Sequence, residues 1–406
     1  MTDAAALDIL LHDQRIGTIA RLNGDRSIFT FDEGYLADEA RSTLSLGFKD
    51  EYGAILNQPR AYQTRIEPFF SNLLPEGTLR DYLARRAGVK SMREYALLAQ
   101  LGGDLPGAVK ALPVEGDAFP DAEAQKATEG ATREARQALR FSLAGVQLKF
   151  SALKNHGKSG GLTIPMSGMG GDWIVKLPSA RHPDVPENEF AAMALAARLG
   201  ITVPEIDLVP LAAIEGLPEG ISRYGDMAYA IRRFDRSEEG PVHIEDFAQV
   251  FGVFPDDKYE NASYRQILSV LAIETDEASI TEFVRRLTYS VLIGNGDMHL
   301  KNWSLIYPDG RRPTLSPAYD LLSTVAYIPE EEAALKFHRS RAWESFTYTE
   351  LETIADRARL PAHLITSTAK KTVEHFDDLW DREKINLPFS AEVIAAIDKH
   401  RKRLAI

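Results

Sequence analysis

The residues best suited to chemistry lie in one short segment, G-N-G-D-M-H-L-K-N, at positions 294–302. Its aspartate, Asp297, and its asparagine, Asn302, have the D-x-x-x-x-N spacing of a phosphoryl-transfer loop. Such an aspartate accepts the proton of the acceptor hydroxyl, and the asparagine binds Mg²⁺. A turn-rich surface loop is the plain alternative, but the flanking glycines and histidine favour the catalytic interpretation.

Two further residues of this segment could stabilise charge on a transferred phosphate. Lys301 is cationic, and His299 would be cationic if protonated. A histidine metal site is not predicted, because none of the nine histidines forms an H-x-x-x-H pair.

A second acid, Asp320, lies downstream in the segment L-S-P-A-Y-D-L-L-S-T at 315–324. A kinase needs such an acid to chelate Mg²⁺ and so bridge the phosphates. The turn P-D-G at 308–310 would form a hairpin that brings this acid back towards the catalytic segment. Alone, Asp320 could equally cap a helix. Combined with Asp297 and Asn302, it is predicted to be the main metal ligand.

Lys176 lies in a predicted strand over 173–177. Kinases use a strand lysine to hold the α- and β-phosphates of ATP. The helix predicted next carries Glu187 and Glu189, either of which could pair with this lysine. A lone strand lysine usually points to solvent, so the kinase interpretation depends on that pairing.

The segment F-S-L-A-G-V-Q-L-K at 141–149 is predicted to form a strand, a turn and a strand. Its backbone N–H groups could cradle phosphates, with Gly145 allowing close approach, although an ordinary hairpin is the plain alternative. Nearby, G-K-S at 157–159 imitates the end of a P-loop. It is rejected because Ala152 stands where that motif needs glycine.

The elements that must position these residues fall into consecutive parts. Residues 1–112 mix strands with helices, 113–139 is predicted to be a linker, 140–236 is β-rich around a helix over 187–199, and 237–406 is helical. Helices are predicted there over 243–251, 264–272, 279–293, 348–358 and 362–380. This order predicts an α+β, two-lobed protein-kinase-like fold: a β-rich N-lobe with an extra N-terminal subdomain, and an all-helical C-lobe.

Composition narrows the classes of function. The length of 406 residues suggests two or three domains. The net charge of −12 is poorly suited to gripping a phosphate backbone, so any role on DNA would run through a basic partner. The absence of cysteine excludes disulfides, thiolate zinc sites and cysteine nucleophiles. Neither a signal peptide nor a membrane span is recognised, and we expect a soluble, cytoplasmic protein.

Together and in this order, the segments resemble the HipA family of bacterial toxin kinases. The resemblance covers nearly the whole chain, and the segments around Ser142 and Asp297 are its most specific parts. It also includes F-S-N-L-L-P-E-G at 70–77, G-A-V at 107–109, N-E at 188–189 and R-F-D-R at 233–236. It implies an ATP- and Mg²⁺-dependent serine/threonine protein kinase that arrests translation, often by phosphorylating an aminoacyl-tRNA synthetase. It further implies a partner like HipB, a helix-turn-helix antitoxin that places the complex on operator DNA.

The resemblance also implies roles for individual residues. Asp297 would be the catalytic base, Asn302 and Asp320 the metal ligands, and Ser142 a serine whose autophosphorylation ejects the phosphate loop and inactivates the enzyme. The ATP-binding residues would be Ala144, Gly145, Val146, Gln147, Leu148, Lys149, Lys176, Arg232, Arg233, Phe234, His299, Leu300, Lys301, Asn302, Tyr319 and Asp320. Many relatives have an acidic residue in place of Arg232, which leaves nucleotide preference open.

Two other functions fit parts of the pattern. Small-molecule kinases of the aminoglycoside or choline type share the D-x-H-x-x-N loop, but the Ser142 segment and the extra N-terminal region favour the HipA type. A nucleotide-binding corepressor without catalysis would be free to lose Asp297, Asn302, Lys176 and Asp320, and all four are present.

Overall fold

The computed structural model describes residues 6–50, 52–86, 88–114, 149–154, 162–163, 171–217 and 220–406. Most of the predicted linker lies outside the described residues. So do several residues predicted to bind or control ATP, namely Ser142, Ala144, Gly145, Val146, Gln147 and Leu148.

The N-terminal subdomain is built on an antiparallel sheet with the strand order β4-β3-β2-β1-β5. Alternate residues of its first strand are buried, because successive side chains of a strand point to opposite faces. A tight turn at His12 and Asp13, both with positive φ, joins the first two strands. The strands are β1 (Ala6–Leu11), β2 (Gln14–Leu22), β3 (Arg26–Phe31), β4 (Ala61–Gln63) and β5 (Val109–Pro113). The helices are α1 (Glu33–Ala37), α2 (Pro68–Ser71), α3 (Gly77–Arg86) and α4 (Glu94–Leu101).

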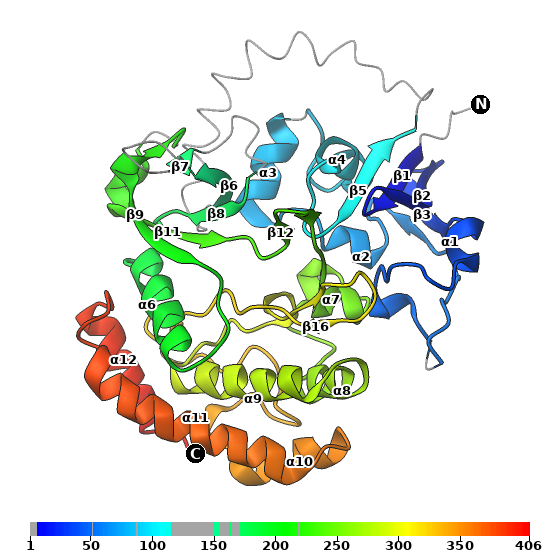
Figure 1. The fold of residues 1–406 in the computed structure, drawn as a ribbon. Helices are drawn as coiled ribbons and strands as arrows, with labels where there is room; N and C mark the ends of the chain where they lie inside the picture. Colours follow the sequence, from blue (N-terminus) through cyan, green and yellow to red (C-terminus); the bar gives the residue numbers. More distant parts are fainter. Residues whose placement is uncertain are drawn as a thin grey trace.

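The next part is a second sheet with the strand order β10-β7-β6-β8-β11-β9. Its strands are β6 (Lys149–Lys154), β7 (Leu162–Thr163), β8 (Trp173–Lys176), β9 (Ile206–Pro210), β10 (Ile214–Glu215) and β11 (Met227–Arg232). The helix α6 (Val185–Arg198) lies between this sheet and the long C-terminal helices (Figure 1). The predicted helix end at Gly200 is confirmed, since Gly200 has a φ of 84°.

The C-terminal lobe is mainly helical, and it forms the end of the molecule opposite the two sheets (Figure 1). Its helices are α7 (Phe247–Val250), α8 (Tyr264–Glu274), α9 (Glu277–Leu292), α10 (Tyr348–Arg357), α11 (Ala362–Glu383) and α12 (Ala391–Arg401). The last of them was not predicted from the sequence. None of the helices among the described residues is long and apolar enough to cross a membrane.

The expectation of an entirely helical C-lobe was wrong in one respect. A three-stranded sheet of β14 (His243–Asp246), β15 (Ser304–Tyr307) and β16 (Thr314–Leu315) lies within it. The first half of the helix predicted over 243–251 is therefore strand β14. Residues 243–246 pair with β15, where His243 is opposite Tyr307, and helix α7 begins only after its cap residue Asp246. This pairing with a distant strand overrides the local helical pattern. A small hairpin of β12 (Arg236–Ser237) and β13 (Gly240–Pro241) precedes it.

The N-terminal subdomain is bonded to both lobes of the kinase-like part. Asp235, which follows the last strand of the β-rich lobe, accepts a hydrogen bond from Gly107 N at 2.8 Å and pairs with Arg236 at the same distance. On the other side, Asn72 donates to the carbonyl oxygen of Val253 at 2.8 Å, and Gln249 donates to that of Phe69 at 3.0 Å. These bonds fix the subdomain close to the elements that carry the predicted catalytic residues.

Candidate active site

The segment predicted to be catalytic follows α9 as a tightly held loop. Gly294 turns the chain with a φ of 63°, and a Cβ there would lie 2.4 Å from the side chain of Val325. The Gly294 carbonyl accepts hydrogen bonds from Thr324 N and Val325 N, at 3.0 and 3.1 Å. The loop is therefore locked to the segment that follows Asp320, and only glycine fits at this contact.

Asp297 and Asn302 are brought together as their spacing predicted. The side-chain nitrogen of Asn302 donates to the carbonyl oxygen of Asp297 at 2.7 Å. Because that bond uses the amide nitrogen, the side-chain oxygen of Asn302 is the atom that can act as a metal ligand. The Asp297 carboxylate is 43% exposed and so can be reached by an acceptor hydroxyl.

Lys176 is buried and paired, which decides between the two glutamates considered for it. Its ammonium lies 2.6 Å from Glu189 of α6 and also pairs with Asp320. Glu189 is buried on the inner face of α6, whereas Glu187 is only half-buried. One helix thus supplies the partner that holds the strand lysine, as a kinase requires.

The charges of this cluster support one another. Burial acts to raise the pKa of Asp320, but the ammonium of Lys176 holds it at about 2, so the carboxylate is ionised at neutral pH. Burial acts to lower the pKa of Lys176, but Asp320 and Glu189 raise it above its ordinary value. The cluster therefore presents a permanent cation beside a permanent anion.

The backbone at Asp320 is in an unusual conformation. Its φ of 56° lies in the left-handed region that non-glycine residues seldom adopt. Asn295 of the catalytic loop donates to the Asp320 carbonyl at 3.3 Å, and Asn188 of α6 exchanges two hydrogen bonds with Ser323 at 2.9 and 3.1 Å. Strained positions of this kind persist where surrounding contacts over-determine them, commonly at functional sites.

Two aromatic residues of the predicted nucleotide site meet. The rings of Phe234 and Tyr319 lie 5.6 Å apart, and Tyr319 donates to the Lys301 carbonyl at 2.8 Å. The backbone N–H groups of Arg232 and Arg233 already donate to carbonyl oxygens, at 2.8 and 2.7 Å. If this segment contacts adenine, it must therefore use groups other than these two N–H groups.

Three other predicted residues have distinct surroundings. Leu300 is fully buried, and Lys149 begins β6 as an exposed residue whose Cα pairs with that of Lys176. Burial lowers the pKa of His299 to about 4, so this histidine is neutral near pH 7. The suggestion that His299 adds positive charge to the site was therefore wrong, and Lys301 is the cation of the loop.

Two contacts of the catalytic loop were not anticipated. Tyr259 donates to the Asp297 carboxylate at 2.5 Å, and Glu76 of the N-terminal subdomain pairs with Lys301 at 2.9 Å. No local motif marks Tyr259. Glu76 lies in the segment 70–77, which was noted in the sequence without a role.

The residues present fit a magnesium ion bound together with a nucleotide. Asp320 and Asn302 offer oxygen donors, which Mg²⁺ prefers, and it commonly takes only one or two protein ligands besides phosphates and water. Within the described part of the chain, no group of three or more His, Asp or Glu side chains could hold a metal by itself.

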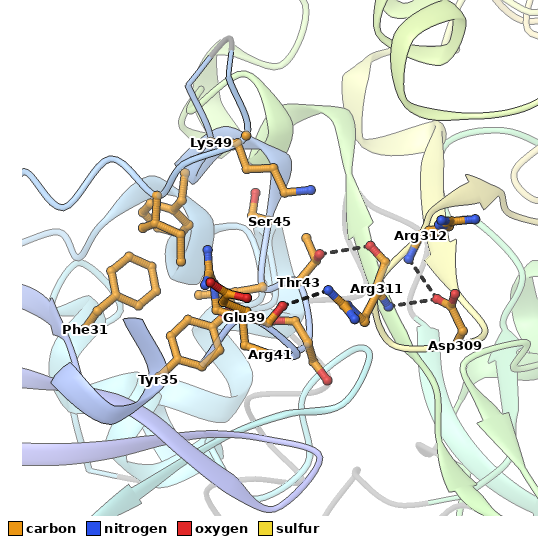
Figure 2. Close-up of a pocket in the computed structure, with 15 residues that line it drawn as sticks. Phe31, Tyr35, Glu39, Arg41, Thr43, Ser45, Lys49, Asp309, Arg311 and Arg312 are labelled. Carbon is orange, nitrogen blue, oxygen red and sulfur yellow. Dashed lines mark hydrogen bonds between the residues drawn. The ribbon is translucent and has the colours of Figure 1, made fainter. Parts of the chain in front are cut away.

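A separate cleft of about 510 Å³ lies between the N-terminal subdomain and the β15–β16 hairpin (Figure 2). Its walls are bonded to each other: Thr43 donates to the Arg311 carbonyl at 2.9 Å, and Arg311 donates to the Glu39 carbonyl at 2.8 Å. None of the predicted catalytic, ATP-binding or metal-binding residues lines this cleft. The two hydrogen bonds bind the hairpin between the catalytic loop and Asp320 to the N-terminal subdomain.

Replacing Glu189 with glutamine should destabilise the fold. Lys176 would keep Asp320 as a charged partner, and burial raises the pKa of Glu189 itself to about 7. The cost should therefore lie at or below the lower end of the ~3–5 kcal/mol for breaking a buried ion pair. Glu187→Gln on the same helix should change stability by less than ~0.5 kcal/mol, as for ordinary surface substitutions. Denaturant unfolding of both variants measures this, and equal effects would contradict the pairing.

Comparison with known proteins decides the family. A family model described as the HipA-like C-terminal domain matches residues 141–380, and one described as the HipA N-terminal domain matches 7–112. This chain belongs to the HipA family. It is 55% identical over 98% of its length to a Sinorhizobium fredii protein named "Putative kinase Y4dM", of which 97% is covered.

More distant relatives share the same architecture. The chain is 27% identical to the serine/threonine-protein kinase toxin HipA of Shewanella oneidensis, over 99% of this chain and 95% of the toxin. A solved structure of the Shewanella oneidensis HipA, HipB and operator DNA complex matches with a TM-score of 0.71 and 22% identity. That match covers 98% of this chain and 95% of the other. The two-lobed kinase-like fold of the HipA family is thus confirmed.

Proposed function

We propose that this HipA family member is a serine/threonine protein kinase that uses ATP and Mg²⁺ and acts as the toxin of a toxin–antitoxin pair. The observation that carries the proposal is the complete constellation: Lys176 paired with Glu189 and Asp320, next to a loop that contains Asp297 and Asn302. A protein that only bound a nucleotide would have no need of the accessible base Asp297.

Each residue has a definite task in this proposal. Lys176 binds the α- and β-phosphates, and Asp297 accepts the proton of the acceptor hydroxyl as it attacks. Mg²⁺, when bound with ATP, neutralises charge on the phosphates, and Asn302 and Asp320 would hold it. Lys301 supplies a positive charge for the transferred group.

The named relatives support a proposal for the biological role. The Shewanella relative is named a toxin, and the solved complex contains HipA, HipB and operator DNA. We therefore propose a HipB-like helix-turn-helix partner, with operator DNA bound mainly through that partner because this chain carries a net charge of −12. The proposed substrate is a protein of translation, such as an aminoacyl-tRNA synthetase, in the cytoplasm.

Ser142 is proposed as a self-inactivation site. A phosphoserine adds roughly −1.5 to −2 charges and three acceptor oxygens. Next to the phosphates of ATP this charge would repel the nucleotide. Lys149, Lys176 or the pair Arg232 and Arg233 would offer the modified serine a new partner. The phosphate loop would then leave the site, an order–disorder switch driven by local charge.

The experiment incubates the purified chain with bacterial cell extract, Mg²⁺ and γ-labelled ATP, and maps the label by mass spectrometry. We expect label on a serine or threonine of another protein and on Ser142 of the chain itself. Asp297→Asn protein should show neither. Label on an aminoglycoside or choline with no modified protein would instead identify a small-molecule kinase. An active enzyme whose Ser142 stays unmodified would remove the self-inactivation mechanism only.

A further inference from the structure

Glu76 of the N-terminal subdomain lies between two lysines of the catalytic lobe. Its carboxylate is 2.9 Å from the ammonium of Lys301 and 2.8 Å from that of Lys258. Lys301 belongs to the catalytic loop, and Lys258 precedes the tyrosine that contacts Asp297. The three side chains are between 14% and 33% exposed, so water screens them far less than surface ion pairs.

The same segment of the subdomain also binds Lys301 through Asn72. The carbonyl and side-chain oxygens of Asn72 accept from the Lys301 ammonium at 2.8 and 3.2 Å. Asn72 is itself fixed, because its side-chain nitrogen donates to the carbonyls of Pro68 at 2.9 Å and Val253 at 2.8 Å. Lys301 is thus held by a rigid cradle that belongs to another part of the chain.

Lys258 is connected to the same loop through its backbone and through the residue that follows it. Its carbonyl oxygen accepts from Leu300 N at 3.2 Å, and the next residue, Tyr259, donates to the Asp297 carboxylate at 2.5 Å. Of the two lysines bonded to Glu76, Lys301 thus lies in the same loop as Asp297, and Lys258 directly precedes the tyrosine that is bonded to the Asp297 carboxylate. Burial acts to raise the pKa of Glu76, but Lys301 and Lys258 lower it to about 2, so it is charged at neutral pH.

We propose that Glu76 is a positioning residue of the phosphoryl-transfer site, which it serves by holding Lys301 and Lys258, the two lysines connected to the Asp297 loop. According to this proposal, the N-terminal subdomain contributes a positioning residue to the active site. The inference rests on the proposed kinase function. A purely structural role for Glu76 would affect only stability. The proposal instead requires that loss of Glu76 lower catalysis through its effect on Lys301.

The test measures phosphate transfer by the full chain with Glu76→Gln, which removes the charge but keeps the shape. We expect kcat to fall by about 10- to 100-fold, the scale of a small misplacement of a catalytic group. The KM for ATP should change less than about threefold, because an interaction made mainly in the transition state is lost. Glu76→Asp, which keeps the charge, should recover part of kcat.

The matched control is Asp256→Asn. This change breaks another ion pair between the same two parts of the chain, Arg65–Asp256 at 2.7 Å, only two residues before Lys258. It should leave kcat unchanged. A double variant supplies the decisive comparison: once Lys301→Met has lowered kcat, adding Glu76→Gln should lower it no further, because residues that act together are not additive.

Three results would overturn the proposal. One is a wild-type kcat in Glu76→Gln. Another is an equal loss of kcat in Glu76→Gln and Asp256→Asn together with a lower unfolding temperature, which would mean that the interface only stabilises the fold. The third is a fully additive loss in the double variant, which would separate Glu76 from Lys301. Absence of transfer by wild-type protein would instead refute the kinase function, and this proposal with it.

Discussion

Asp297→Asn should transfer phosphate at least about 100-fold more slowly than wild-type protein, the scale of a general base that also positions the nucleophile. An asparagine cannot take up the proton of the acceptor hydroxyl. It still offers an oxygen to Tyr259, and the hydrogen bond from the Asn302 side chain to the backbone carbonyl of residue 297 is kept, so the loop should retain its structure. Initial rates with γ-labelled ATP measure the effect, and a circular dichroism spectrum checks the fold.

The matching control is Glu260→Gln, which removes an exposed carboxylate next to Tyr259 and should leave the rate unchanged.

The variants Asp297→Asn and Glu260→Gln also test the toxin role in cells. Expression of wild-type or Glu260→Gln protein should slow bacterial growth by inhibiting translation, whereas Asp297→Asn should be harmless. A rate near that of wild type in Asp297→Asn would refute Asp297 as base, and equal slowing of growth would show that toxicity is not catalytic.

Asp320→Asn should bind Mg·ATP at least about tenfold more weakly, a loss of ~1.4 kcal/mol. A hard cation would lose a carboxylate oxygen, which an amide replaces poorly. Asp297→Asn should change the same Kd by less than about threefold, because its carboxylate serves the acceptor and not the metal. Calorimetric titration with ATP, in the presence and absence of Mg²⁺, measures both.

Titration without Mg²⁺ separates the effect of Asp320→Asn on the metal site from its effect on Lys176. Asp320 is also a partner of Lys176, so its loss alters the lysine as well as the metal site. If the metal role is correct, Asp320→Asn should reduce the gain in affinity that Mg²⁺ gives. The opposite ranking of the two variants would mean that the roles of Asp297 and Asp320 are exchanged.

Features governed by neighbours in sequence were predictable. The D-x-x-x-x-N spacing placed Asp297 and Asn302 in one loop, where the Asn302 side chain donates a hydrogen bond to the Asp297 backbone carbonyl. The turn at 308–310 produced the β15–β16 hairpin, and Gly200 ended α6 because its positive φ suits glycine. For these features the deciding interactions span only a few residues.

Contacts between distant segments were decided by the tertiary structure. Whether Glu187 or Glu189 pairs with Lys176 depends on the rotation of α6 against the sheet, which spacing alone leaves open. The segment 243–246 became a strand because β15 offered it a partner.

For the chemistry of the site, the sequence alone indicated the types of group that are available. These are a base, a metal-binding acid, a strand lysine and a loop lysine. Their charge states came from the fold, since burial makes His299 neutral while Lys176 keeps Asp320 ionised. The bond from Glu76 to Lys301 joins residues more than two hundred positions apart, and only chain packing can bring such groups within hydrogen-bonding distance.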